Sequence, residues 1–576
     1  MVGFHVTIRT SASPLSGLYG RVWISLIGTL SESPPVRVEH CLLPGSAYTV
    51  VIKSKEEVGI VVLLKLRLEA QPGFPDLDWH CGDVQVRRSS EDPEVEVFPC
   101  HKWIRTADGN VELRNAKKVM CLKKKETLAI LTNHRERDLP TKTTVYQVKP
   151  FLLINGPHCV DMSSVTALGP NFSYIRQRYP VNNVHYIKSF IERRTSWSSL
   201  QELETFFLFN GRENTIAKYV QAHWQEDAFF GYQCLNGCNP LCIRQIHNLP
   251  PNLSVTSEMM VRPFLPEDSS LEQEMEGRHV YLLDYEVLDQ LPANTVNDKQ
   301  TYLAAPLCLL HYNRQGELKP IAIQSPSLIR CIKIFFAKMW VRNSDFQVHQ
   351  LLSHFLRTHL IGEVCCTAAL RQLPEIHPLH QVETKFSSKN HAVLTLTTRL
   401  LLFSCGESSP EGQGCKHKTI RKKLYIYIYI YSNLFPQSFQ TAAEMCKFVT
   451  MVIFSCSALH AAVNFSQVCS VINKLTEVPA AMSRPPSQTK GSVSEEDIFS
   501  FLPEVNSSCH VLSVLSLLSQ PAIDFVPLCS GATVKLVEEV WRELKMIAKD
   551  IADRNSQLEL PYTYLSPDHI ENSVTI

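Results

Sequence analysis

Two apolar runs of this chain each contain a pair of metal-binding side chains. His354 and His359 lie in the run LLSHFLRTHL, and His460 and Asn464 lie in MVIFSCSALHAAVNF. The chain ends at Ile576, whose α-carboxylate is a further oxygen ligand. Together these groups offer nitrogens, an amide oxygen and a carboxylate to one metal ion. The sequence therefore suggests that two helices meet around a common metal site.

The spacing of His354 and His359 constrains the first of these helices. Residues 340–360 have a start signal at Ser344 and Asp345 and apolar side chains at helical spacing, which predicts a mostly buried helix. In an ideal α-helix, two residues five positions apart point about 140° away from each other. They reach one ion only where the helix widens to i→i+5 hydrogen bonds, a rare winding that occurs mostly at functional sites.

The second run needs no such distortion. His460 and Asn464 are four positions apart, so an ordinary α-helix puts them on one face. Residues 441–465 are apolar nearly all round, which favours a helix buried in a large core. A plainer interpretation stands beside the metal site, because a histidine on an apolar helix is usually a core residue whose polar atoms are satisfied.

Composition narrows the class of protein. The chain has 576 residues, 44% of them hydrophobic, which suits one small and one large domain. Its net charge of +1 gives no bulk attraction to nucleic acid, and we expect no nucleic-acid partner. The 19 cysteines lack regular spacing, as is typical of free thiols in a reducing cytosol. Cys234, Cys238 and Cys242 fit neither zinc nor iron–sulfur spacing, so we interpret them as small buried residues.

The chain shows no targeting or membrane-spanning signal. Its N-terminus, MVGFHVTIRTSAS, lacks a basic region followed by a long apolar run, so no signal peptide is expected. We find no run of about 18 apolar residues and therefore expect no transmembrane helix.

The hydrophobic pattern divides the chain in two. Residues 1–115 contain short alternating runs such as FHVTIRTS and RVWISLIGT, broken by Gly, Pro and Ser, which predict an antiparallel β-sandwich. Beyond residue 116 the pattern becomes mostly helical. Val537, Val540, Leu544 and Ile547, for example, follow the spacing of an amphipathic helix.

Longer stretches of the chain resemble the animal lipoxygenase family, with a lean toward its arachidonate and epidermal-type members. The resembling stretches, in family order, are HWQEDAFFGYQCLNGCNP, YLAAPLCLLHYNRQGELKPIAIQ, WVRNSDFQVHQLLSHFLRTHLIGEV, RQLPEIHP, MVIFSCSALHAAVNFSQ, LPEVNSSC and LPYTYLSPDHIENSVTI. The resemblance implies an N-terminal PLAT β-sandwich over residues 1–115 and a large, mostly α-helical catalytic domain over residues 116–576.

The resemblance also implies roles for individual residues. The family's iron ligands fall on His354, His359, His460, Asn464 and the carboxylate of Ile576. Three further residues match or adjoin positions that orient ligands and substrate, namely Gln350, Gln467 and His349. For His349, simple helix packing is an equally good interpretation.

The implied activity is that of a non-haem iron dioxygenase. In that family a hydrogen atom is removed from a bis-allylic carbon of a polyunsaturated fatty acid such as arachidonate, and O₂ adds to the carbon radical to give a lipid hydroperoxide. Two alternatives remain: a hydroperoxide isomerase (epoxyalcohol synthase) at the same iron, and a catalytically impaired lipid-binding protein. The expected location is cytoplasmic, with peripheral membrane association through the N-terminal domain.

Several side chains of the N-terminal domain are candidates for membrane or calcium binding. Trp23, Trp79 and Trp103 are candidates for contact with lipid headgroups, although for Trp103 we favour packing within the protein. The loop 13–20 lacks the acidic residues of calcium-dependent relatives, whereas Asp76 and Asp83, with Asp78 between them, offer oxygen ligands in another loop. The sequence leaves calcium binding open.

The resemblance stops over residues 381–436. This stretch contains KHKTIRKKLYIYIYIYSNLF, a low-complexity segment with strict Tyr/Ile alternation. Such alternation arises from a simple dinucleotide repeat, so we interpret the segment as translated non-coding sequence that replaces a family segment. The two histidine sites are consequently 101 positions apart, fewer than is usual in the family. The missing part normally covers the substrate, and its loss would impair activity.

Overall fold

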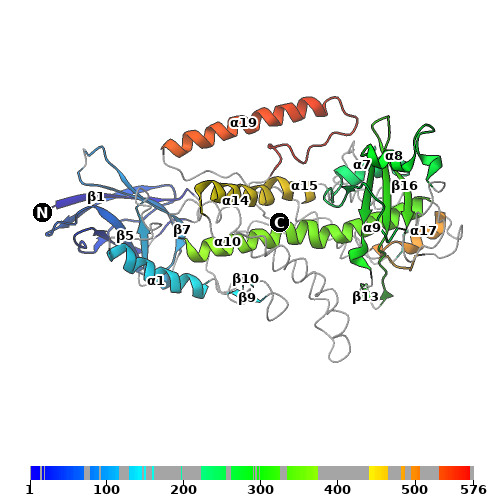
Figure 1. Cartoon of the computed structure of the whole chain (residues 1–576). Coiled ribbons are helices and arrows are strands. Elements are labelled where there is room, and N and C mark those ends of the chain that lie inside the picture. The colour runs from blue at the N-terminus through cyan, green and yellow to red at the C-terminus, as the bar shows by residue number, and fades with distance from the viewer. Residues whose placement is uncertain are drawn as a thin grey trace. The chain divides into compact units, whose positions relative to one another are not determined.

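The computed structural model describes residues 2–115, 129–145, 148–150, 158–160, 222–253, 261–324, 334–373, 440–464, 482–486, 495–505 and 531–570, with short gaps inside 2–115 and 261–324, and the isolated residues 196, 197 and 219. The chain forms two compact units (Figure 1). The first comprises Met1–Lys149, His158–Arg178 and Val364–Ala392, and the second comprises Pro150–Pro157, Tyr179–Glu363 and Val393–Ile576.

Two four-stranded antiparallel sheets make up most of the first unit. One sheet has the order β4-β1-β6-β7, and the other has the order β3-β2-β5-β8. The strands are β1 (Val2–Thr10), β2 (Arg21–Gly28), β3 (Val36–Val38), β4 (Ala47–Ser54), β5 (Val61–Glu69), β6 (Trp79–Arg87), β7 (Glu96–Ile104) and β8 (Asn110–Arg114). The helix α1 (Ala129–Val145) follows and packs Leu131 on Ile27, Val62 and Leu63.

Alternation along the strands builds the core of this unit. In β1 every second residue is buried, and Phe4, Val6 and Ile8 are at most 1% exposed. These side chains belong to the same cluster as Ile24 and Leu64 of the other sheet. Successive strand residues point to opposite faces, so alternation buries one face of each sheet against the other. The predicted β-sandwich is confirmed.

The three tryptophans of the sandwich differ in their surroundings. Trp79 is fully buried, and its indole Nε1–H donates to Thr10 Oγ1 at 3.1 Å, so its assignment as a membrane-contacting residue is wrong. Trp103 packs edge-on against His80 with 5.1 Å between ring centroids, as the packing interpretation held. Trp23 lies under the Arg67 guanidinium, 5.8 Å from the ring centroid, and donates to Glu69.

A four-stranded sheet of order β11-β12-β15-β16 forms one part of the second unit. Its strands are β11 (Arg244–Gln245), β12 (Val280–Asp284), β15 (Leu307–Tyr312) and β16 (Leu318–Gln324). Helix α7 (Asp227–Asn236) lies against β16, and a Cβ on Gly231 would stand 1.7 Å from the Leu318 carbonyl oxygen. Only glycine permits this close approach of helix and strand.

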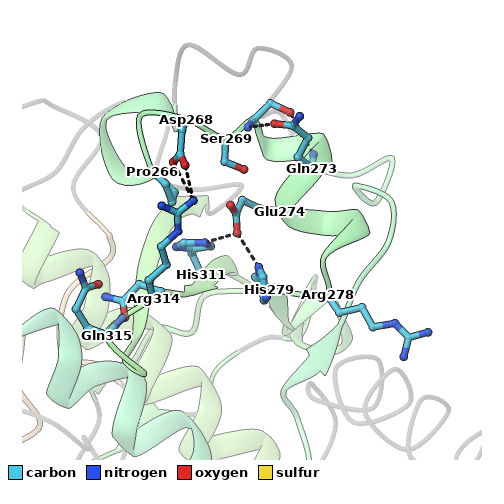
Figure 2. A network of polar contacts seen from close by, with 12 residues as sticks. Pro266, Asp268, Ser269, Gln273, Glu274, Arg278, His279, His311, Arg314 and Gln315 are labelled. Carbon is cyan, nitrogen blue, oxygen red and sulfur yellow. Dashed lines mark hydrogen bonds and ion pairs between the residues drawn. The ribbon is translucent and has the colours of Figure 1, made fainter.

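A buried carboxylate ties the short helix α8 (Leu271–Glu276) to this sheet (Figure 2). Glu274 Oε2 accepts hydrogen bonds from His279 Nδ1 and from His311 Nε2 of β15, each at 2.9 Å. Burial alone would raise the pKa of Glu274, but hydrogen bonds from Ser269, His311 and His279 outweigh it and lower that pKa from 4.5 to about 2. The carboxylate is therefore charged and fully engaged at neutral pH.

One helical stretch runs from Ile334 to Gln372 and changes its winding twice. It consists of α9 (Ile334–Val348), the π-helix η7 (His349–Leu360) and α10 (Ile361–Gln372). The predicted helix is confirmed, but its predicted start is wrong. Ser344 and Asp345 lie inside α9, where Ser344 Oγ donates to the Ala304 carbonyl at 2.9 Å and Asp345 pairs with Arg342 at 2.8 Å. They serve contacts across the core rather than a helix cap.

Helix α9 is packed on two sides. Its residues Val341 and Val348 belong to a core with the sheet residue Leu310, and Phe336 packs edge-on against Phe501 of α17 (Glu495–Phe501) with 4.7 Å between ring centroids. Burial on both sides explains why this helix is apolar over most of its surface.

The second predicted helix comprises α14 (Ala442–Phe454), the π-turn η9 (Ser455–Leu459) and α15 (His460–Asn464). Thr441 caps its start by accepting a hydrogen bond from the Glu444 amide. The helix is confirmed, but its expected full burial is not, because Met451 and Phe454 are exposed whereas all of α15 is buried. Within the second unit, η9 and α15 contact the π-helix η7.

The stretch Ala443–Asn464 also bears on the membrane expectation. It has 22 residues and a mean hydropathy of 1.6, which suffices by length and composition to cross a membrane. Length and composition also fit a core helix, so the expectation of no transmembrane helix stays a prediction. The last turn of this stretch bonds to η7 inside the protein, as core helices do.

The helix predicted around Val537 is confirmed as α19 (Gly531–Asn555). Its apolar stripe is largely exposed. Its members Val540, Leu544 and Ile547 and the neighbouring Trp541 are 39–47% exposed, and Ala548 is buried. Periodicity predicted the helix, whereas burial depends on what packs against it.

We expect the Glu274 carboxylate to make stability depend on pH. Because its folded pKa is lowered from 4.5 to about 2, its contribution is full above pH 4.5 and is lost as the pH falls toward 2. The shift corresponds to roughly 3 kcal/mol. Glu274→Gln should therefore lower the urea midpoint at pH 7 and approach the wild type at pH 3. Glu272→Gln, on the exposed face of α8, is the control. If both variants follow the wild type at every pH, the network does not stabilise the fold.

Candidate metal centre

Three histidines from the two long helices converge inside the second unit. His354, His359 and His460 each offer one ring nitrogen, and these three atoms lie within 4.8 Å of one another. The side chains are 4%, 3% and 1% exposed, so the cluster is shielded from water. Nε2 of His354 and Nε2 of His359 are 3.0 Å apart. Among the described residues, this is the one group of three or more His, Cys, Asp or Glu side chains that could hold a metal ion.

The π-helix brings the first two histidines together. Residues 349–360 follow the i→i+5 winding that the five-residue spacing requires, so His354 and His359 lie one π-turn apart on the same face. Their ring centroids are 4.8 Å apart. The predicted widening of the helix is confirmed over the whole of η7.

The second helix supplies the third histidine. His460 is the first residue of α15, and its ring centroid lies 5.4 Å from that of His354 and 5.0 Å from that of His359. Asn464 follows one α-helical turn later and is 1% exposed. The spacing of four thus places the amide on the side of the helix that bears His460.

His349 links the two helices beside the cluster. Its Nε2–H donates to the Val463 carbonyl at 2.6 Å, and its ring stacks on His354 with 5.5 Å between centroids and 16° between planes. Burial lowers the pKa of His349 from 6.5 to about 4, although the bond to Val463 opposes the shift. The ring is therefore neutral at pH 7, and its Nδ1 has no hydrogen-bond partner among the described residues. His349 both packs in the helix and connects it to the residue before Asn464.

The remaining predicted site residues are placed less fully. Gln350 lies on η7 and is half-buried. Gln467 and the terminal Ile576 lie outside the described residues, and their roles stay predictions. Of the candidate calcium ligands, Asp76 also lies outside the described residues, whereas Asp83 is in β6 and its Oδ1 is buried without a hydrogen-bond partner in the part of the chain described. Calcium binding stays a prediction.

Sequence reasoning missed the polar network beneath the histidines. The Asp345 carboxylate accepts hydrogen bonds from Arg342, Tyr285 and Asn239, and Asn239 in turn accepts one from Ser353. All five side chains belong to residues that are at most 2% exposed. Burial raises the pKa of Asp345, while Arg342, Tyr285 and Asn239 oppose that shift by binding its carboxylate. A charged pair inside an otherwise apolar helix was the signal in the sequence, because buried charges are normally paired.

The cysteines near this network behave as small buried residues. Cys234 and Cys238 are at most 2% exposed, and burial raises the pKa of the Cys242 thiol to about 12. A thiol that stays protonated is a poor metal ligand. The interpretation of these three cysteines as packing residues agrees with the structure.

The donor set at the histidines suits iron. Imidazole nitrogens with an amide or carboxylate oxygen are ligands that non-haem iron accepts, and three histidines leave coordination positions free. The three buried rings each place one nitrogen within 4.8 Å of the others, which is close enough for one ion to bind all three. The residues present therefore fit a single metal ion.

Two family models match the sequence. The model described as PLAT/LH2 domain matches residues 4–115, and the model described as Lipoxygenase matches residues 177–402. The second match thus runs into the stretch 381–436 and ends within it.

Curated relatives extend the comparison over the whole chain. The rat polyunsaturated fatty acid lipoxygenase ALOX15B is 31% identical over 691 positions, and the Homo sapiens hydroperoxide isomerase ALOXE3 is 29% identical over 729 positions. Each alignment covers 100% of this chain and 100% of the relative. Each alignment is longer than the 576 residues of this chain, so each relative has segments without a counterpart here.

Solved structures share the fold. A coral 8R-lipoxygenase matches with a TM-score of 0.81 at 22% identity, and a calcium-dependent 11R-lipoxygenase matches with a TM-score of 0.80 at 20% identity. Both matches cover 100% of each chain. The β-sandwich followed by a larger, mostly helical domain is thus the fold of these proteins.

We expect His349 to stabilise the junction of the two helices. His349→Phe would leave the Val463 carbonyl without its donor in the core, which should lower the free energy of unfolding by about 1–3 kcal/mol. His349→Gln keeps an N–H donor and should recover part of that loss. Urea unfolding of the metal-free variants measures both. Equal losses in the two variants, or no loss in His349→Phe, would contradict a stabilising hydrogen bond.

Proposed function

Since the chain belongs to the lipoxygenase family, we propose that it is a non-haem iron dioxygenase that converts polyunsaturated fatty acids such as arachidonate into lipid hydroperoxides. The observation that supports this most directly is the convergence of three buried histidines across a π-helix and a neighbouring helix. The same cluster explains why the rare winding is present, because an α-helix would separate His354 from His359.

The proposed iron site uses five protein ligands. His354, His359 and His460 supply ring nitrogens, and the amide of Asn464 and the carboxylate of Ile576 complete the set. When bound, iron supplies the one-electron chemistry that removes a hydrogen atom from a bis-allylic carbon. Five ligands leave one of six positions free for the reaction.

The side chains around the site have separate tasks in this proposal. The burial of the three histidines excludes bulk water and strengthens electrostatic interactions with the metal. His349 stays neutral and adds no charge beside the ligands, while its bond to Val463 fixes the helix that bears Asn464. Gln350, half-buried on η7, and Gln467 are proposed to orient ligands and substrate.

A hydroperoxide isomerase is the second candidate. A relative with that name is 29% identical over the full chain, close to the 31% of the fatty-acid lipoxygenase. Identity therefore does not separate the two activities. Both would use the same histidines, and they differ in whether O₂ or a supplied hydroperoxide is consumed.

The two parts of the chain have distinct proposed roles. Residues 1–115 dock on lipid surfaces, residues 116–576 perform the reaction, and the protein works in the cytoplasm with peripheral membrane association. The PLAT/LH2 match over residues 4–115 supports this division. Trp23 is half-exposed and Trp79 is buried, so Trp23 is the better candidate for contact with headgroups.

Removal of a proposed ligand should remove the iron. His354→Ala removes one nitrogen ligand. Mutation of a residue that only hydrogen-bonds to a metal ligand typically lowers metal affinity by roughly 10–100-fold, and we expect the loss of iron affinity here to be at least as large. Metal analysis of the purified protein after dialysis against a chelator measures this. His247→Ala, at an exposed position of the same unit, is the matched control. Full iron content and full activity in His354→Ala would show that the site lies elsewhere.

Oxygen uptake should separate the candidate activities. A dioxygenase given arachidonate consumes O₂ and forms conjugated diene in equal amounts. An isomerase consumes a supplied fatty-acid hydroperoxide without net O₂ uptake. An iron-loaded protein that does neither would contradict both enzymatic proposals and would support a lipid-binding role.

A further inference from the structure

A buried amide lies across the point where the α-helix becomes a π-helix. Asn239 is 1% exposed and follows α7 in the chain. Its Nδ2 group donates to Asp345 Oδ1 at 2.7 Å and lies 3.2 Å from the Asp345 carbonyl oxygen. Its Oδ1 accepts a hydrogen bond from Ser353 Oγ at 2.6 Å. The two bonded residues lie on opposite sides of the junction between Val348 and His349.

The chemistry of the partners fixes the orientation of this amide. The Asp345 carboxylate accepts hydrogen bonds from Arg342 and Tyr285, so the NH₂ group of Asn239 faces it as a third donor and the Asn239 oxygen faces the Ser353 hydroxyl. Asp345 is itself held in place, since Tyr285 OH donates to Oδ1 at 2.7 Å and Arg342 Nη1 donates to Oδ2 at 2.8 Å. One end of the bridge is therefore anchored to α9 and to Tyr285, which directly follows β12.

The other end of the bridge adjoins the metal centre. Ser353 is 1% exposed and directly precedes His354 on η7. Its rotation about the helix axis determines the direction of His354, because neighbouring residues of a helix turn together. A π-helix is rare and needs support from its surroundings, and a planar amide that spans the junction holds the two windings in one register.

We propose that Asn239 is a positioning residue of the metal centre, which bridges Asp345 and Ser353 and so sets the π-winding that makes His354 and His359 converge. The identity of the metal rests on the proposed iron function. The positioning itself rests on the contacts of Asn239 and on its place at the helix junction.

A merely structural role would have a different signature. Ser344 provides the comparison, because it is also a buried serine of the same helical stretch and donates one hydrogen bond, to the Ala304 carbonyl at 2.9 Å. That bond does not cross the junction. Loss of the Ser344 hydroxyl removes its bond to the Ala304 carbonyl, whereas loss of the Ser353 hydroxyl breaks the bridge to Asn239.

The test compares Ser353→Ala with Ser344→Ala in the full-length protein. Fe²⁺ affinity is measured by competition with a chelator, the melting temperature of the metal-free protein reports stability, and electron paramagnetic resonance of the ferric form reports ligand geometry. We expect both variants to lower the melting temperature. Only Ser353→Ala should weaken Fe²⁺ binding, by about 10-fold, and alter the ferric spectrum. Asn239→Ala should weaken binding at least as much.

Two results would overturn the proposal. One is an equal change of Fe²⁺ affinity in Ser353→Ala and Ser344→Ala, and the other is wild-type affinity and spectrum in Ser353→Ala. If Asn239→Ala does not fold, the comparison of the two serine variants still decides. If the wild type itself retains no iron, the proposed function fails. The same comparison with Co²⁺, which imidazole also binds, then tests the positioning role separately.

Discussion

The wide winding of η7 is the constraint on which the rest of the second unit depends. Two histidines five positions apart in an α-helix cannot bind the same metal ion, and over residues 349–360 the backbone instead has i→i+5 hydrogen bonds. A second helix then brings His460 to within 4.8 Å of both. The π-helix thus brings two histidines that are five positions apart close enough to bind one ion.

Such a winding persists because the polar groups around it are paired. Lys338, Arg342 and Asp345 are buried charges on α9, and each has a partner: Lys338 donates to the Gln225 carbonyl, and Arg342 pairs with Asp345. His349 binds the Val463 carbonyl from the neighbouring helix. Removing one member would leave another unsatisfied in the core, which costs more than the bond itself contributes. The network thus over-determines the positions of the histidines.

Much of the fold could be predicted where local periodicity and burial coincide. The strands of the sandwich alternate because each sheet has one buried face, and the prediction was correct. The apolar stripe of α19 and the apolar surface of α14 have the same kind of pattern, yet Leu544 and Phe454 are exposed. Periodicity reports the winding of a segment, while burial depends on neighbours that are distant in sequence. Ser344 and Asp345 were misassigned as a helix start for the same reason. Ser344 binds the Ala304 carbonyl, and Asp345 binds Tyr285 and Asn239 as well as Arg342 of its own helix.

The sequence by itself determined the identities and spacings of the metal-binding side chains. Five positions between His354 and His359 require a π-turn if both bind one ion, and four between His460 and Asn464 do not. Only the tertiary structure decided that the two helices meet there, that His349 joins them through Val463, and that Asn239 spans the change of winding. The physical reason is that helix spacing is a local property of the backbone, whereas convergence depends on contacts between residues more than 100 positions apart.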